Sequence, residues 1–320
     1  MKELLEDLPK NKEIFESFLV AKSKMDNINY ENVLVSISGG SDSDIMLDII
    51  HRCDTEKKAK YIWFDTGLEY QATKEHLKYL EEKYGIEIIV GKPTKAIPTC
   101  CKEFGQPFLS KLASEYIERL QRHNFQWEDE SFEVLYERYP KCKSALRWWT
   151  NTWGENSKFN IKRHKLLKEF MIQNPPPPIS NKCCKFAKKD IAKRYKKENK
   201  VDLNIVGVRK AEGGARSSAY KNCFTVKEDD CDEYRPIFWY KEETKRAYEE
   251  YFDIQHSKCY SEYGLKRTGC AGCPFGRDFE FELEVLEKYE PKMHKAVTNI
   301  FKDSYEYTRQ YRKFREEIKK

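Results

Sequence analysis

The feature that most constrains the fold is a short β-branched run that ends in two glycines. Residues 32–38 read NVLVSIS, and Gly39 and Gly40 follow directly. Residues 42–52 then place Ile and Met at helical spacing. A buried strand, a glycine loop and a helix in this order predict an α/β unit whose helix packs back on a parallel sheet.

Later segments repeat this pattern. Two further β-like runs, at 60–64 and 86–90, flank a helical pattern at about 70–84, and strand character returns at 203–208. The sequence therefore predicts an α/β fold with a parallel-sheet, Rossmann-like core.

The chain divides into four predicted parts. Its 320 residues equal roughly two domain lengths if about 150 residues is taken for each. The first part (1–103) is the first half of the α/β core with an opening helix at 4–25, and the second (104–180) is a basic helical insertion that ends in the extended prolines 175–178. The third part (181–240) is the second half of the core, with a helix at about 184–198. The fourth (241–320) is a Cys-bearing loop with a helical C-terminal region that includes a long helix after Pro291.

Composition favours a globular protein of the cytoplasm. Charged residues make up 35% and hydrophobic residues 39% of the chain. No apolar run approaches the roughly 18 residues of a membrane span, and the first residues are too charged and too acidic for a signal peptide. We therefore expect no membrane partner. Eleven cysteines, an odd number, point to thiol, metal or redox chemistry more than to a disulfide framework.

Positive charge is concentrated in one region. Residues 141–200 hold 17 Lys or Arg and 4 Asp or Glu, although the whole chain carries a net charge of only +6. The same region contains Trp148, Trp149 and Trp153. Basic residues interleaved with aromatic ones suit phosphate neutralisation and base stacking, so a tRNA or DNA acceptor is a hypothesis for this region. The alternative is a pair of solvated helices with lysines on their outer faces.

The glycine loop has the features of a phosphate-binding loop. It comprises Ser38, Gly39, Gly40, Ser41, Asp42 and Ser43. Glycines let backbone amides approach an anion, hydroxyls add donors, and the helix N-terminus favours negative charge. Neither G-x-x-x-x-G-K-[ST] nor G-x-G-x-x-G occurs in the chain. A tight turn that caps the helix is the alternative.

Four ordered motifs carry a resemblance to a known family. The loop SGGSDS resembles the S-G-G-x-D-S loop of the PP-loop ATP pyrophosphatases, and more narrowly the chain resembles the phosphoadenosine phosphosulfate (PAPS) reductase family. The other matches are Phe64-Asp65-Thr66-Gly67, then Gly207-Val208-Arg209 with Glu212 and Arg216, and finally Cys183-Cys184 with Cys270-x-x-Cys273. Gly213 stands where the family usually has Ser in the third motif.

The resemblance implies an adenine nucleotide alpha hydrolase-like fold and an ATP site. The loop would hold the β and γ phosphates, with Asp42 as a candidate Mg²⁺ ligand. Arg209 and Arg216 would stabilise charge on departing pyrophosphate. Asp65, Thr66, Gly67 and Glu212 would complete the nucleotide site.

Two cysteine pairs form a candidate metal centre. Four thiolates in two local pairs suit zinc or an iron–sulfur cluster. The adjacent Cys183 and Cys184 favour a cluster over a single zinc, because neighbouring side chains diverge. In adenylyl-sulfate reductases of this family a similar arrangement carries a 4Fe-4S cluster, so the resemblance points to iron. Zinc and free or redox thiols are the alternatives. The remaining cysteines, Cys53, Cys100, Cys101, Cys142, Cys223, Cys231 and Cys259, receive no role, and the six histidines show no motif of a separate site.

Three functions remain open. The first is an ATP pyrophosphatase that adenylates an acceptor for sulfur transfer to a nucleic acid or small molecule, with a sulfur-donor protein as a partner. The second is a sulfonucleotide reductase, although the family's C-terminal E-C-G-[IL]-H element is absent and Cys100, Cys101 or Cys223 would have to act. The third is a non-catalytic protein that binds nucleotide or nucleic acid. The intact loop favours the first.

Overall fold

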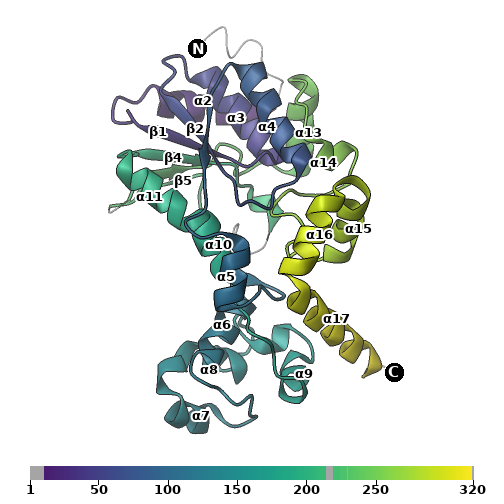
Figure 1. Cartoon of the computed structure of the whole chain (residues 1–320). Helices are drawn as coiled ribbons and strands as arrows, with labels where there is room; N and C mark the ends of the chain where they lie inside the picture. Colours follow the sequence, from purple (N-terminus) through teal and green to yellow (C-terminus); the bar gives the residue numbers. More distant parts are fainter. Residues whose placement is uncertain (1–10, 214–218, 229, 319–320) are drawn as a thin grey trace. The chain divides into compact units, whose positions relative to one another are not determined.

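The computed structural model describes residues 11–213, 219–228 and 230–318, and the chain divides into two compact units (Figure 1). The first unit comprises Met1–Pro93 and Lys188–Cys270. The second comprises Thr94–Ala187 and Ala271–Lys320.

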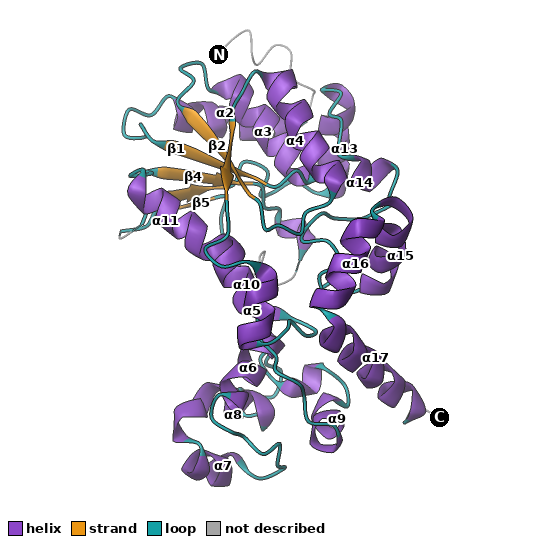
Figure 2. Cartoon of the chain, viewed as in Figure 1, coloured by secondary structure: helices purple, strands orange, loops and turns teal. Residues whose placement is uncertain are grey.

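The first unit is an α/β structure with one sheet, whose strands are orange in Figure 2. Its elements are α2 (Lys12–Met25), β1 (Val33–Ile37), α3 (Ser41–Cys53), β2 (Ala59–Phe64), α4 (Gln71–Tyr84), β3 (Ile88–Gly91), α11 (Asp190–Glu198), β4 (Leu203–Val206), β5 (Phe224–Thr225), β6 (Asp232–Tyr234), α13 (Glu242–Tyr251) and α14 (Lys258–Ser261).

The strand order is β3-β2-β1-β4-β6-β5. All neighbouring pairs are parallel except β5 with β6. The chain moves outward from β1 through β2 to β3 and then returns to β4 on the other side of β1. Such a reversal leaves a crevice at the carboxyl ends of the strands, where open α/β sheets bind ligands.

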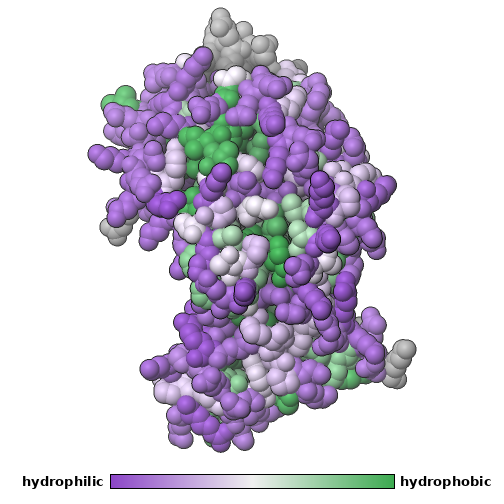
Figure 3. Space-filling model, viewed as in Figure 1, coloured by the Kyte–Doolittle hydropathy of each residue, from purple (hydrophilic) through white to green (hydrophobic). Residues whose placement is uncertain are grey.

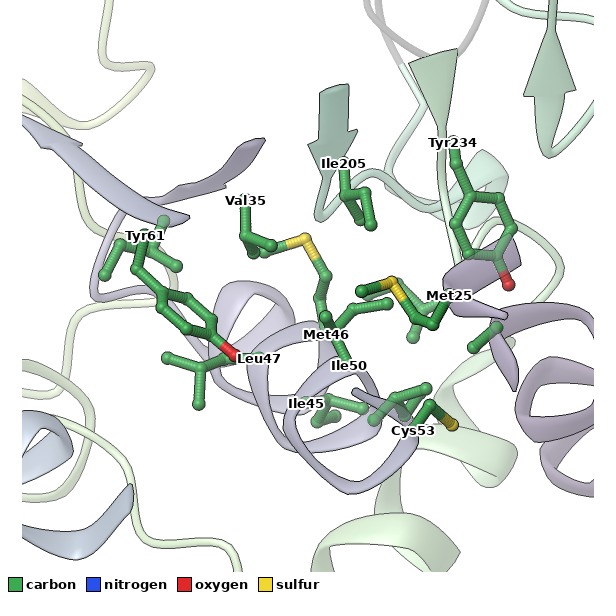
Figure 4. Packing of buried hydrophobic residues seen from close by; sticks show 14 of the residues in the cluster. Met25, Val35, Ile45, Met46, Leu47, Ile50, Cys53, Tyr61, Ile205 and Tyr234 are labelled. Atoms are coloured by element: carbon green, nitrogen blue, oxygen red, sulfur yellow. The ribbon is translucent and has the colours of Figure 1, made fainter. Parts of the chain in front are cut away.

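Alternation along β1 assigns its residues to the two faces of the sheet. Val33, Val35 and Ile37 belong to the main core cluster, whereas Leu34 is buried without belonging to it. In Figure 4, Met46 and Ile50 of α3 point toward Val35 and Ile205 of the sheet. The same cluster includes buried side chains of α2, α4 and α13. Each fully buried aliphatic side chain contributes roughly 1.5–3 kcal/mol to stability.

The opposite face of the sheet is approached by α11. A Cβ added to Gly91 at the end of β3 would lie 3.2 Å from Ile191 of α11 and 2.8 Å from Phe64 of β2. Helices therefore cover both faces, as a parallel sheet requires.

The second unit is helical. Its elements are α5 (Ile97–Phe104), α6 (Lys111–Gln121), α7 (Phe132–Arg138), α8 (Lys143–Trp149), α9 (Leu167–Gln173), α10 (Lys182–Cys184), α15 (Phe279–Tyr289), α16 (Pro291–Ile300) and α17 (Lys302–Glu317), with short 3₁₀ turns at Pro140–Cys142 and Ile161–Arg163.

An aromatic core holds this unit together and corrects one expectation. Trp148 is 1% exposed and Trp149 is 0% exposed, and both belong to its core cluster. Trp149 Nε1 donates to the carbonyl of Glu128 at 2.9 Å. The expectation that these two rings stack on bases is wrong, because they are needed inside. Trp153 is only partly buried.

The predicted α/β class with a parallel-sheet core is confirmed, and the differences are local. The helix expected at 184–198 consists of α10, a π-helical turn at Lys185–Lys189 and α11. The helix expected after Pro291 is two helices, because buried Phe301 interrupts it with φ −108° and ψ 18°. The short strands β5 and β6 were not predicted. Of the opening helix expected at 4–25, the first seven residues lie outside the described residues.

Polar residues dominate the face of the molecule in Figure 3. None of the helices in the described part of the chain combines the length and apolarity that a membrane crossing requires.

Candidate functional site

Three predicted motifs follow neighbouring strands of the first unit. The loop 38–43 follows β1, residues 65–67 follow β2, and residues 207–209 follow β4. β1 pairs in parallel with both β2 and β4, so their carboxyl ends meet at one edge of the sheet. The structure thus brings together motifs that are up to 171 residues apart at the topological switch point.

The loop after β1 is shaped by glycine and serine. Gly39 has φ +66°, and a Cβ there would lie 2.8 Å from Thr73 Cγ2. Ser43 Oγ accepts a hydrogen bond from the Ser38 amide at 2.9 Å. The Ser41 amide, in the first turn of α3, donates to the Tyr260 hydroxyl at 3.1 Å. An amide at a helix N-terminus that donates to a hydroxyl is oriented to serve an anion's oxygen equally well.

Asp42 lies between two cations. Its Oδ1 is 2.8 Å from Arg209 Nε and 3.0 Å from Lys245 Nζ. Lys245 Nζ also lies 2.5 Å from Ser41 Oγ, and Arg209 reaches Glu242 at 3.2 Å. Burial by itself raises the pKa of Asp42, but Lys245 and Arg209 outweigh it and hold this pKa below its ordinary value. Asp42 is therefore a carboxylate that ties the loop to β4 and α13.

Gly207 permits this close approach. A Cβ added to Gly207 would lie 3.1 Å from the carbonyl oxygen of Asp42 and 3.2 Å from Ser43 Cα. A larger residue would push the end of β4 away from the loop. The glycine of the G-x-R pattern is therefore required here by the close packing of two backbones.

The Asp-Thr-Gly turn after β2 has its own network. Asp65 Oδ1 accepts from the Gly67 amide at 2.9 Å, and Gly67 has φ +81°. Thr66 Oγ1 donates to Glu69 at 2.8 Å and accepts from Cys270 Sγ at 3.4 Å. Burial raises the pKa of Glu69, which is 3% exposed, although Lys188 at 3.7 Å opposes the rise. Cys270 is thus held beside the Asp-Thr-Gly turn after β2.

Glu212 and Arg216 are the other residues of the arginine motif. Glu212 is exposed in a short 3₁₀ turn, Lys210–Glu212. Arg216 lies outside the described residues. Their predicted contacts with a nucleotide stay predictions.

The cysteines are distributed over both units. Cys183 and Cys184 are on α10 of the second unit, whereas Cys270 is the last residue of the first. The pKa of Cys183 is raised by its hydrogen bond with Cys184, by burial and by the neighbouring thiols Cys101 and Cys273. Burial raises the pKa of Cys101 to about 12, with Cys100 and Cys184 adding to the rise. The described residues contain no group of three or more His, Cys, Asp or Glu side chains that could hold a metal.

Cys101 is a neighbour that spacing did not indicate. It lies on α5, which packs against α10 within the second unit. The sequence offers no signal for this proximity, because Cys101 and Cys184 are brought together only by helix packing.

A buried carboxylate–histidine network lies behind the loop and was also missed. Asp44 Oδ2 is 3.0 Å from His76 Nε2 and 2.7 Å from His256 Nδ1. His256 Nε2 lies 2.8 Å from Glu249, which is 3.7 Å from Lys245. Burial alone raises the pKa of Asp44, but the two histidines reverse the direction and lower it. The network connects α3, α4 and α13 through residues with no common sequence pattern.

His256 gives a pH-dependent contribution to stability. Burial lowers its pKa, but hydrogen bonds with Asp44 and Glu249 outweigh burial and raise it from 6.5 to about 9. A histidine with a raised pKa stabilises the fold fully below the unfolded value and loses this contribution as pH rises through the folded value. The rise corresponds to at most about 3 kcal/mol.

We expect the free energy of unfolding to fall between pH 7 and 9.5, and His256→Gln to remove that part of the fall. Urea unfolding over this pH range measures it. His123→Gln, in the second unit, is the matched control and should keep the wild-type profile. An unchanged profile in His256→Gln would show that the imidazolium does not stabilise the network.

One comparison with known proteins agrees with the family resemblance over part of the chain. Residues 32–124 match the family model of the phosphoadenosine phosphosulfate reductase domain, which confirms the predicted resemblance over that part of the chain. No curated protein matches the chain.

Three of the solved structures with an overall likeness to this chain illustrate the range of enzymes. They are PAPS reductase from Candida auris (14% identity, 82% of this chain and 97% of that chain, TM-score 0.44), the U34-tRNA thiolase NcsA from Methanococcus maripaludis with its [4Fe-4S] cluster (14%, 95% and 81%, 0.40) and NH3-dependent NAD synthetase from Campylobacter jejuni (11%, 95% and 96%, 0.39). At these identities and scores, the likeness carries no argument about activity.

Proposed function

We propose that this chain is an ATP pyrophosphatase of the PAPS reductase type, which adenylates an acceptor for sulfur transfer. The observation that carries the proposal is the intact loop at 38–43, with Asp42 ion-paired to Arg209 at the switch point of a parallel sheet. The match of residues 32–124 to the PAPS reductase domain supports it.

The residues suit a substrate with several phosphates. The first turn of α3 offers the Ser41 amide and the positive end of the helix dipole. Arg209 and Lys245 contact the same turn and add two positive charges. An acceptor oxygen would attack the α phosphorus, and the α–β bond would break with release of pyrophosphate. Sulfide from a donor protein would then attack the adenylated carbon and displace AMP. Asp42 is the candidate ligand for Mg²⁺, which would neutralise phosphate charge.

Replacing Asp42 with Asn should abolish release of pyrophosphate from ATP. The change also leaves Arg209 and Lys245 without their shared carboxylate, so we expect a loss of roughly 1–3 kcal/mol in stability. Pyrophosphate and AMP are measured with ATP and Mg²⁺, and thermal unfolding is measured in parallel. Asp253→Asn, an exposed change of the same chemistry, should leave both properties at wild-type values.

The same assay with adenylyl sulfate and PAPS tests the second candidate function. A sulfonucleotide reductase is favoured by one observation, the placement of Cys270 Sγ at 3.4 Å from Thr66 of the nucleotide edge. In that reaction the Cys270 thiolate would attack sulfur, the S–O bond to the nucleotide would break, and a dithiol reductant would release sulfite. Sulfite from a sulfonucleotide, with ATP left intact, would reject the pyrophosphatase.

A 4Fe-4S cluster on Cys183, Cys184, Cys270 and Cys273 is part of the proposal, with zinc as the alternative. It rests on the spacing of the two pairs and on their resemblance to the reductases. The raised pKa values of the cysteines in the second unit mean that ligation must displace protons from buried thiols.

Anaerobically purified protein should contain iron and absorb visible light. Cys270→Ser should remove the absorbance and lower the melting temperature, because metal binding is coupled to folding. Cys101→Ser and Cys142→Ser should keep the absorbance, because neither belongs to the predicted set. A colourless wild type with no iron would reject the cluster, and stoichiometric zinc would replace it.

The nucleic-acid acceptor is proposed for one group of exposed cations in the second unit. The group consists of Lys141, Lys143, Lys158, Lys162, Arg163 and Lys165. Among the described residues, no carboxylate is ion-paired with any of them. Phe159 is 38% exposed and contacts Trp153, with 5.9 Å between ring centroids. Trp153 therefore remains a candidate for base stacking, and Phe159 joins it in place of the buried Trp148 and Trp149.

The combined change Lys162→Glu, Arg163→Glu and Lys165→Glu should weaken binding of tRNA or DNA at least tenfold at low salt. Fluorescence anisotropy with a labelled tRNA and a DNA duplex measures it. Lys292→Glu, Lys295→Glu and Lys302→Glu, exposed in the same unit, make the same change in charge and should bind like the wild type. Equal loss in both triple variants would indicate net charge alone, and no loss would reject this surface.

A further inference from the structure

Lys245 belongs to none of the motifs that identify the phosphate loop, yet it contacts that loop directly. It lies in the first turn of α13, and its side chain is 10% exposed. Its Nζ is 2.5 Å from Ser41 Oγ and 3.0 Å from Asp42 Oδ1. Lysine is almost never buried to this degree unless it is paired, so the position of its ammonium group is determined by these two contacts.

The carboxylate that holds Lys245 already has another partner. Asp42 Oδ1 also accepts from Arg209 Nε at 2.8 Å. Two cations therefore share one carboxylate oxygen in the first turn of α3. The two nearby glutamates neutralise these cations only in part. Glu249 also accepts a hydrogen bond from His256, and the Glu242 side chain is 56% exposed to solvent. An anion bound at this turn would therefore lie close to both Arg209 and Lys245.

Lys245 and the Ser41 amide are hydrogen-bond donors at the same residue of the loop. The amide donates to the Tyr260 hydroxyl at 3.1 Å, and Lys245 Nζ contacts the side chain of that same serine. A Cβ added to Gly40 would meet Thr268 Oγ1 at 3.0 Å and the Tyr260 hydroxyl at 3.2 Å, so hydroxyl groups line this part of the loop. A phosphate oxygen that replaced the Tyr260 hydroxyl on the amide would lie within reach of the ammonium.

We infer that Lys245 binds the pyrophosphate part of the nucleotide and selects for polyphosphates over single phosphates. The inference rests on the proposed function and adds a binding residue from α13. A lysine ammonium supplies three donors as a compact charge, whereas Arg209 supplies a planar fork. Together they match the several charged oxygens of pyrophosphate better than the single phosphate of AMP.

Binding to the full chain tests the inference without relying on turnover. Isothermal titration with Mg²⁺ and pyrophosphate, ATP or AMP compares the wild type with Lys245→Met. We expect the Kd for pyrophosphate and ATP to rise at least tenfold and the Kd for AMP to stay within about twofold. Lys245→Arg should restore part of the affinity, because it keeps the charge.

Arg246→Met is the matched control. Arg246 is the next residue of α13 and is exposed, so its replacement removes one positive charge from the same helix without touching the loop. We expect wild-type binding from it. Thermal unfolding verifies that each variant is folded, and Lys245→Gln carries the same test if the methionine variant unfolds.

The possible failures are distinguishable. Wild-type affinity for pyrophosphate in folded Lys245→Met or Lys245→Gln would overturn the role of Lys245 and leave the pyrophosphatase proposal standing. An equal loss of AMP binding would overturn selection for polyphosphates. A wild type that binds neither ATP nor pyrophosphate would overturn both proposals.

Discussion

The ion pairs of Asp42 hold the candidate site together. A single carboxylate in the first turn of α3 contacts Arg209 after β4 and Lys245 of α13. None of these three side chains could be buried alone without a large cost, because an unpaired charge loses its hydration. Their mutual neutralisation lets the end of β4 and the start of α13 close on the loop. The lack of a side chain at Gly207 supplies the space.

A second set of charged groups, Glu249, His256 and Asp44, adjoins the ion pairs of Asp42. Lys245 neighbours Glu249, which contacts His256, and His256 contacts the buried Asp44. Asp42 and Asp44 are two residues apart in one helix but have different partners. Asp42 contacts Arg209 after β4 and Lys245 of α13, whereas Asp44 contacts two histidines. The first turn of α3 thus carries two carboxylates at the end of the helix where the dipole favours negative charge. An anionic ligand would enter a turn whose own carboxylates are already neutralised.

Local patterns predicted much of the fold because local chemistry determines it. The run 32–38, the glycines and the periodicity of 42–52 predicted β1, its loop and α3 within a few residues of their bounds. β5 and β6 could not be predicted, since they have two and three residues and depend on pairing with each other and with β4. The tryptophans of α8 were misjudged for a related reason. Basic neighbours suggested a surface, but only tertiary packing shows which side of a short helix is inside.

The candidate site, like the fold, combines residues that sequence motifs predict with residues that only tertiary packing brings together. The contact of Asp42 with Arg209 joins two motifs that sequence resemblance had already paired. Lys245 of α13, His76 of α4 and His256 after α13 belong to no sequence pattern, because only tertiary packing brings them to the first turn of α3. The cysteines give a further example. Spacing pairs Cys183-Cys184 with Cys270-x-x-Cys273, yet helix packing adds Cys101 to the neighbours of Cys184. The hydrogen bond with Cys184, burial and the charges of Cys184, Cys101 and Cys273 all raise the pKa of Cys183, because each added negative charge disfavours the next. A bound cation would reverse that repulsion and release protons, so the affinity of any cluster or zinc at these cysteines must increase with pH.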